Sequence, residues 1–134
     1  MDLRKIVQNQ SAKLSVKKAL VIQEDLIMLK ILERLVTSAG FQCRASSSID
    51  TLTTAEMSGM YDVVISDILF DDGISSFDYA FQLKEVIYSK HLFIVTKMGQ
   101  EMIRKNFLNM EGVDGFYGIP FDLDELEDEL NVLF

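Results

Sequence analysis

The sequence predicts one α/β domain built on an open parallel sheet, and three observations lead to that prediction. Short apolar runs without alternation recur along the chain, as strands buried on both faces require. Segments with apolar residues at helical spacing separate these runs, so each strand is joined to the next by a crossover helix, and the strands should be parallel. The 134 residues are 49% hydrophobic and 25% charged, a composition typical of a globular domain. We therefore expect helices on both faces of one sheet.

The first half of the chain predicts two strands and two helices before a central strand. The continuous apolar run Ala19 to Ile22 ends at a polar triplet, and Ala39-Gly40 supplies a stop for the helix that follows. A cluster of three serines, Ser46 to Ser48, offers an N-cap for the second helix. The expected elements are a strand at 19–22, a helix at 26–38, a strand at 41–45, a helix at about 49–57 and a strand at 62–67.

The second half repeats the same alternation. Ser75 or Ser76 can cap a helix, and Asp122 can cap the last one. Pro120 closes the final strand, because proline cannot donate to a sheet ladder. The expected elements are a helix from about 76 to 87, a strand at 91–96, a helix at about 100–110, a strand at 115–119 and a helix from 122 to 133. Residues 1–16 lie outside this pattern and are predicted to form an N-terminal leader before a domain at 17–134.

Composition excludes several classes of function. The net charge of −8 disfavours nucleic-acid binding, which draws its affinity from Lys and Arg. No apolar run is long enough to span a membrane, and the first ten residues lack a signal-peptide core. Cys43 is the single cysteine, so no intrachain disulfide can form. We expect a cytoplasmic protein that does not bind membranes or nucleic acids.

Polar residues follow several predicted strands, at the edge where open parallel sheets bind ligands. They are the triplet Gln23-Glu24-Asp25, Asp67 and Thr96, with Ile119-Pro120 after the last strand. Glu24 and Asp67 would be neighbours if the first and third strands pair. Clustered carboxylates repel one another, which favours a cation site, and an oxygen-only site suits Mg²⁺.

Four segments resemble the receiver domain of bacterial two-component response regulators. They are residues 18–25, 62–69, 93–96 and 112–121, with the Asp67 block and the Gly-x-Asp-x-Phe block ending in Pro120-Phe121 as the most specific parts. The resemblance covers residues 18–134. It implies a flavodoxin-like (CheY-like), doubly wound, five-stranded parallel sheet in the order 2-1-3-4-5.

The resemblance also implies roles for individual residues. Asp67 matches the phosphoacceptor, and the implied Mg²⁺ ligands are Glu24, Asp67 and the backbone carbonyl of Leu69. Thr96 matches the hydroxyl that binds the phosphoryl group, and Phe116 matches the aromatic switch position. The implied protein is a stand-alone phosphorelay domain, not an enzyme. Its implied partners are a histidine kinase or phosphotransfer protein and a downstream protein, reached through a face that includes Tyr117 and the acidic last helix.

The sequence departs from the family at three pocket positions. Gln23 replaces the first of two acids after the first strand, which predicts weaker Mg²⁺ binding unless Asp25, Asp71 or Asp72 compensates. Ile119 replaces the lysine before Pro120, so no ammonium group can contact a phosphoryl group there. The loop after Asp67 also lacks the family's usual proline.

These departures leave an alternative function open. The protein could be a phosphorylation-independent pseudo-receiver that acts as an interaction module. A metal-dependent phosphatase-like enzyme is disfavoured, because Leu69 stands where a second catalytic acid would follow Asp67. Thr96 could be an ordinary strand-end hydroxyl and Phe116 a core residue, while His91 and Cys43 are expected to be structural.

Overall fold

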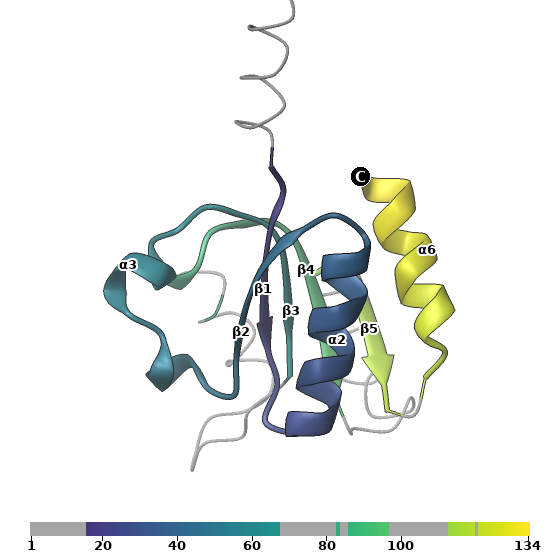
Figure 1. Ribbon diagram of the computed structural model, residues 1–134, viewed down its shortest axis with the longest axis horizontal. Helices are drawn as coiled ribbons and strands as arrows, with labels where there is room; N and C mark the ends of the chain where they lie inside the picture. The colour runs from purple at the N-terminus through teal and green to yellow at the C-terminus, as the bar shows by residue number, and fades with distance from the viewer. Residues whose placement is uncertain (1–15, 68–82, 84–85, 97–112, 120) are drawn as a thin grey trace, which may run out of the picture.

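A five-stranded sheet forms the centre of the computed structural model, which describes residues 16–67, 83, 86–96, 113–119 and 121–134 (Figure 1). Its order is β2-β1-β3-β4-β5, and each neighbouring pair is parallel. The predicted parallel sheet in the order 2-1-3-4-5 is therefore confirmed. The strands are β1 (Lys18–Ile22), β2 (Gln42–Ser46), β3 (Tyr61–Ser66), β4 (Ser89–Thr96) and β5 (Gly115–Gly118).

Apolar side chains fill both faces of the sheet, as continuous apolar strands predict. Helices α2 (Leu26–Ser38) and α6 (Leu123–Leu133) cover one face, and both run alongside the sheet in Figure 1. The other face packs against residues near α3 (Thr54–Met57) and against Leu83 and Ile87. Along β1 the side chains alternate between the two faces, with Leu20 and Ile22 on one and Ala19 and Val21 on the other.

Side-chain caps fix where the helices begin. Asp25 is the N-cap of α2 and accepts hydrogen bonds from the backbone N–H groups of Ile27 and Met28 at 2.9 and 3.2 Å. Asp122 caps α6, as predicted, by accepting from the N–H of Asp124. Such caps satisfy N–H groups that have no partner within the helix.

The predicted continuous helix over 49–57 is wrong. Ser48 caps only a turn of 3-10 helix, Ile49–Thr51, after which the backbone at Leu52 is extended. The chain then restarts as α3, where the Thr53 hydroxyl and the Glu56 carboxylate form a reciprocal capping box. The Thr53-x-x-Glu56 sequence forms a second helix start, so the chain begins a new helix here instead of continuing the first one.

The other described boundaries agree with prediction to within two residues. Strand β4 begins at Ser89 rather than His91, and β5 ends at Gly118 rather than Ile119. The helices expected near 76–87 and 100–110 fall mostly outside the described residues, as does the leader apart from Val16. Within the described part of the chain, no helix has the length and apolarity to cross a membrane.

A cluster of aromatic and cationic side chains joins the start of β1 to the C-terminal residue, Phe134. The Phe134 ring contacts those of Phe41 and His91 edge-on, with ring centroids 4.9 and 5.3 Å apart. The Lys17 ammonium donates to the Phe134 backbone carbonyl at 3.1 Å and lies over both phenylalanine rings. On β4, His91 pairs with Asp114 at 3.2 Å, which gives this histidine the structural role that the sequence favoured.

Candidate functional site

Asp67 is the residue that follows the central strand β3, at the edge of the sheet where the strands end. Its side chain lies in a largely enclosed position, because the residue is only 8% exposed. Its N–H donates to the Ile22 carbonyl oxygen at 2.8 Å, and its own carbonyl accepts from the Ser66 hydroxyl at 2.8 Å. The first of these bonds holds the backbone of Asp67 against β1, so its position is set by the sheet.

The strand register brings Gln23 to the same level as Asp67. Ile22 pairs with Ser66, and Ser66 pairs with Ile94, so the next residues along the three strands are Gln23, Asp67 and Val95. The sequence prediction that the first and third strands would be neighbours is confirmed.

Gln23 has no exposed surface at all. Its backbone N–H donates to Ser46, and its side-chain Nε2 donates to the Val95 carbonyl oxygen at 3.4 Å. The other amide atom, Oε1, is buried without a hydrogen-bond partner in the described structure. Such a buried acceptor needs a donor, because leaving it without one costs about 1–3 kcal/mol.

The two acids after Gln23 have different environments. Glu24 is exposed, and its carboxylate is therefore available to a cation in solvent. Asp25 instead uses a carboxylate oxygen to cap α2. The sequence left Asp25 open as a replacement for the missing acid, and its role as a helix cap gives that carboxylate another task.

Thr96 ends β4 and is 3% exposed, so its hydroxyl lies inside the same edge of the sheet. Its carbonyl oxygen accepts from the Ile119 N–H at 2.7 Å, which holds the end of β5 against β4. Ile119 is half-buried and packs against the apolar cluster under α2 and α6. This position therefore contributes packing, and it carries no charge.

The two aromatic residues of β5 occupy opposite faces of the sheet. Phe116 is half-buried and packs against the cluster formed by Leu92, Ile94 and their neighbours. Tyr117 lies on the other face, 6% exposed, with its ring 5.1 Å from that of Phe121. The expectation that Tyr117 forms part of an exposed signalling face is wrong, because the alternation along β5 turns it toward α6.

Several predicted site residues cannot be placed. Leu69, Pro120 and the acidic loop 70–73 lie outside the described residues. Gln23, Asp67 and Thr96 are brought together at the ends of three adjacent strands, with Glu24 at the exposed side and Ile119 packed beyond Thr96. Within the described ranges, no group of three or more His, Cys, Asp or Glu residues could hold a metal ion.

Sequence reasoning missed two features of this site. One is the hydrogen bond from the Ser66 hydroxyl to the Asp67 carbonyl oxygen. The sequence gives no signal for it, because the identity of a strand serine does not determine which acceptor its hydroxyl finds. The other is the reach of the Gln23 amide to Val95 across the end of β3. A glutamine directly after a wholly apolar strand was a signal that its side chain would be buried and need a partner.

Comparison with known proteins gives matches among solved structures alone. No family model matches the sequence, and a search of curated proteins finds no match. A CheY-like response regulator receiver domain from Methylobacillus flagellatus is 22% identical and has a TM-score of 0.66, covering 90% of this chain and 100% of its own. The chain has the fold of response regulator receiver domains.

Two further receiver-fold structures contain ligands or a modified residue. The response regulator TrrA from Thermotoga maritima, in complex with Mg²⁺-BeF, is 21% identical with a TM-score of 0.63 and covers 89% of this chain and 100% of its own. A response regulator from Burkholderia pseudomallei has a phosphorylated aspartic acid, a calcium ion and citrate. It is 14% identical with a TM-score of 0.62, and the match covers 87% of this chain and 71% of that one. The flavodoxin-like, CheY-like architecture predicted from the sequence is thus confirmed as a receiver fold.

Proposed function

We propose that the protein is a two-component receiver domain that accepts a phosphoryl group on Asp67 and signals through protein contacts. One observation carries the proposal. Asp67 follows the central strand and is 8% exposed, flanked by the buried ends of β1 and β4. Open parallel sheets bind ligands at this edge, and this is the only acid among the described residues that is buried there.

The chemistry is the transfer of a phosphoryl group from a phosphohistidine of a kinase or phosphotransfer protein. An Asp67 carboxylate oxygen bonds to phosphorus while the P–N bond breaks, and the electron pair of that bond returns to the imidazole nitrogen. The imidazole takes up a proton from solvent and leaves neutral. The product is an aspartyl phosphate, and no oxidant or reductant is needed.

The residues present fit a Mg²⁺ ion that keeps most of its waters. Glu24 and Asp67 supply two carboxylates, and the Leu69 carbonyl is the third proposed ligand. The orphaned Oε1 atom of Gln23 is an acceptor that suits a donor such as a water molecule. When bound, Mg²⁺ would offset charge on the phosphoryl oxygens. With a neutral amide at position 23, we propose weaker metal binding than two acids would give.

Thr96 and Phe116 are the proposed responders to phosphorylation. The Thr96 hydroxyl would donate a hydrogen bond to a phosphoryl oxygen, since it lies buried at the adjacent strand end. Phe116 is half-buried on β5, and its packing on the cluster around Ile94 would couple Thr96 to the surface. The proposal places the protein in the cytoplasm with protein partners rather than nucleic acid.

A second candidate function is the phosphorylation-independent pseudo-receiver. Two observations support it: Gln23 is tied to Val95, and Ile119 is packed into the apolar cluster. Neither side chain brings charge to the pocket. In this case Asp67 would be a structural residue, and the protein would bind its partner constitutively.

Acetyl phosphate separates the two candidates. The protein is incubated with acetyl phosphate and Mg²⁺, and its intact mass is measured beside Asp67→Asn and Asp62→Asn. Asp62 lies at the other end of the same strand, where it accepts the Lys18 N–H, so it is the matched control. We expect the wild type and Asp62→Asn to gain one phosphoryl group and Asp67→Asn to gain none. A wild type that stays unlabelled, under conditions where an ordinary receiver labels, excludes the phosphoacceptor proposal.

A further inference from the structure

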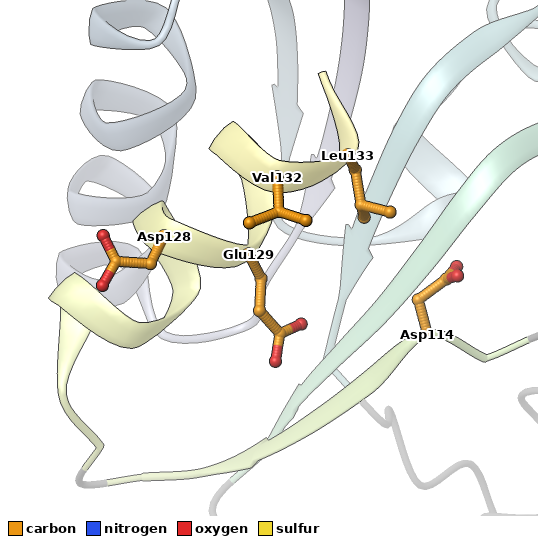
Figure 2. A pocket seen from close by; sticks show the side chains of 5 residues that line it. All are labelled: Asp114, Asp128, Glu129, Val132 and Leu133. Atoms are coloured by element: carbon orange, nitrogen blue, oxygen red, sulfur yellow. The ribbon is translucent and has the colours of Figure 1, made fainter.

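A groove of about 380 Å³ lies between the beginning of β5 and the second half of α6, away from Asp67 (Figure 2). Asp114 lines it from the sheet side, and Asp128, Glu129, Val132 and Leu133 line it from the helix. In Figure 2 the Glu129 carboxylate points from α6 toward β5. The groove therefore combines acidic groups with an apolar wall.

Gly115 lets the Glu129 carboxylate come close to the start of β5. A Cβ atom at Gly115 would lie 3.0 Å from the Phe93 ring and 3.2 Å from Oε2 of Glu129. Any side chain at this position would occupy the space into which Glu129 now reaches. Because Gly115, the first residue of β5, has no side chain, the Glu129 carboxylate can occupy this space.

The groove carries negative charge that is not neutralised within the described structure. The segment 122–129 holds six acids and no Lys or Arg, and none of the six forms an ion pair with a described residue. Asp114 lies beside the His91 ring and accepts a hydrogen bond from the Leu92 N–H. The groove therefore holds three carboxylates, those of Asp114, Asp128 and Glu129, and no described Lys or Arg pairs with any of them.

A buried hydroxyl group lies beside Glu129. Tyr117 is only 6% exposed, and its hydroxyl interacts with the Glu129 carboxylate without forming a hydrogen bond of good geometry. Burial, and then the nearby Glu129 carboxylate, raise the pKa of this phenol well above its usual value. The hydroxyl thus stays protonated beside Glu129.

The helix wall of the groove exposes apolar surface. Val132 is 86% exposed and Leu133 is 38% exposed, next to carboxylates on the preceding turn. An apolar wall beside a carboxylate matches a side chain with an aliphatic stem and a cationic head, because Lys and Arg lay the stem on apolar surface and keep the charge with polar groups.

We propose that this groove binds a Lys or Arg side chain from a basic, partly apolar segment of a partner protein. The stem would lie on Val132 and Leu133, and the cation would lie between Glu129 and Asp128. This inference rests on the proposed function, because that function requires a downstream partner and the groove indicates the chemistry of that partner.

Charge decides against other occupants. Nucleic acid and anionic lipid would be repelled by the acidic groups of α6. A second copy docked through the same groove would bring two acidic helices together, which is unfavourable for like charges. A basic protein segment is the occupant for which the electrostatic interaction is attractive.

Fluorescence anisotropy with a labelled peptide of alternating leucine and lysine tests the proposal. The variants are Glu129→Gln and Val132→Ser, and the matched control is Glu127→Gln, which removes the same charge from α6 outside the groove. We expect Glu129→Gln and Val132→Ser to raise the Kd roughly fivefold or more, and Glu127→Gln less than about twofold. Acetylating the lysines of the peptide should abolish binding. Thermal melting of each variant shows that it is folded.

Three results would overturn the proposal. Equal losses for Glu127→Gln and Glu129→Gln would show a diffuse acidic surface, and equal binding of the acetylated peptide would show that no cation is recognised. If the Val132→Ser variant sediments differently from the wild type in the absence of peptide, the groove is an interface with a second copy of the chain instead. All binding is measured without phosphorylation, on wild type and Asp67→Asn. If the protein is not labelled by acetyl phosphate but still binds the peptide through the groove, only the phosphoacceptor function is rejected. If it is labelled but the groove variants bind the peptide with the same Kd as the wild type, only the groove proposal is rejected.

Discussion

The side-chain amide of Gln23 donates a hydrogen bond to the carbonyl oxygen of Val95, 3.4 Å away, across the end of the strand that precedes Asp67. At this length the bond is weak, and Oε1 on the same amide has no partner in the described structure. A neutral side chain thus occupies the position where the receiver family pattern predicts an acid. The properties of the pocket should depend strongly on that one position.

Gln23→Asp should make folding depend on Mg²⁺. A carboxylate at this fully buried site lacks the bond to Val95 and is desolvated, so the free energy of unfolding in EDTA should fall by about 2 kcal/mol or more. Mg²⁺ should restore much of this loss, because two neighbouring acids then share the ion. Thermal melting across a Mg²⁺ titration measures both effects, with Gln23→Asn as the neutral control. The same Mg²⁺ response in both variants would mean that position 23 does not face the ion.

Asp25 provides a second test of which acids serve the pocket. Asp25→Ala should lower the free energy of unfolding by about 1 kcal/mol, because the Ile27 and Met28 N–H groups lose their acceptor. Asp25→Ser should retain most of the stability, since serine also caps helices. Neither change should alter Mg²⁺ affinity, measured by calorimetry. Weaker Mg²⁺ binding in the stable Asp25→Ser variant would show that Asp25 serves the metal as well.

Ile119→Lys should increase the conformational response to phosphorylation. The added ammonium could contact the phosphoryl group, at the expense of packing that Ile119 makes with the cluster under α2 and α6, worth about 1–2 kcal/mol. Amide hydrogen exchange with and without acetyl phosphate measures the response, and Ile119→Met controls for the loss of shape. Identical responses in the lysine variant and the wild type would show that the missing lysine does not limit switching.

Gly115→Ala should destabilise the protein by crowding. The new Cβ would lie 3.0 Å from the Phe93 ring, and overpacking of this kind costs about 1–3 kcal/mol. Phe93→Leu removes the ring, so the double variant should lose less than the two single losses combined. Urea denaturation of all four proteins gives the coupling. Strictly additive losses would indicate that the cost at Gly115 arises elsewhere.

Cys43 should react slowly with alkylating agents in the folded protein. Burial, and then Glu33, raise the pKa of its thiol from 9.0 to about 11. At pH 8 the thiolate fraction should therefore be roughly a hundredfold lower than in the unfolded chain. The folded state favours the protonated thiol. The contribution of this group to the free energy of unfolding is therefore constant below pH 9 and makes the protein less stable as the pH rises from 9 toward 11. Iodoacetamide labelling followed by mass, with and without urea, measures the ratio; equal rates would contradict the prediction.

The sheet was predictable because it depends on continuous apolar runs, whereas the details of the pocket depend on side-chain partners. Successive apolar residues such as Leu20 and Val21 point to opposite faces, so both faces of the strand had to be buried. The helical segments between the strands then predicted parallel pairing. The break at Leu52 was not predicted, since Thr53 and Glu56 could equally have continued a helix. Tyr117 was wrongly predicted to lie on the signalling face. The family pattern identifies the elements of that face, but the alternation of side chains along β5 determines which of them reach it.

The position of Val16 has a practical consequence for measuring binding. Val16 and Phe134 both line a hollow at the edge of the sheet where β1 begins, and Asp67 lies beyond the far end of that strand. The five residues of β1 put roughly 16 Å between the two edges. A biosensor surface linked ahead of Val16 would therefore hold the protein with Asp67 facing free solution. Under the proposed function, an immobilised chain should take phosphoryl groups from small phosphodonors as readily as a chain in free solution.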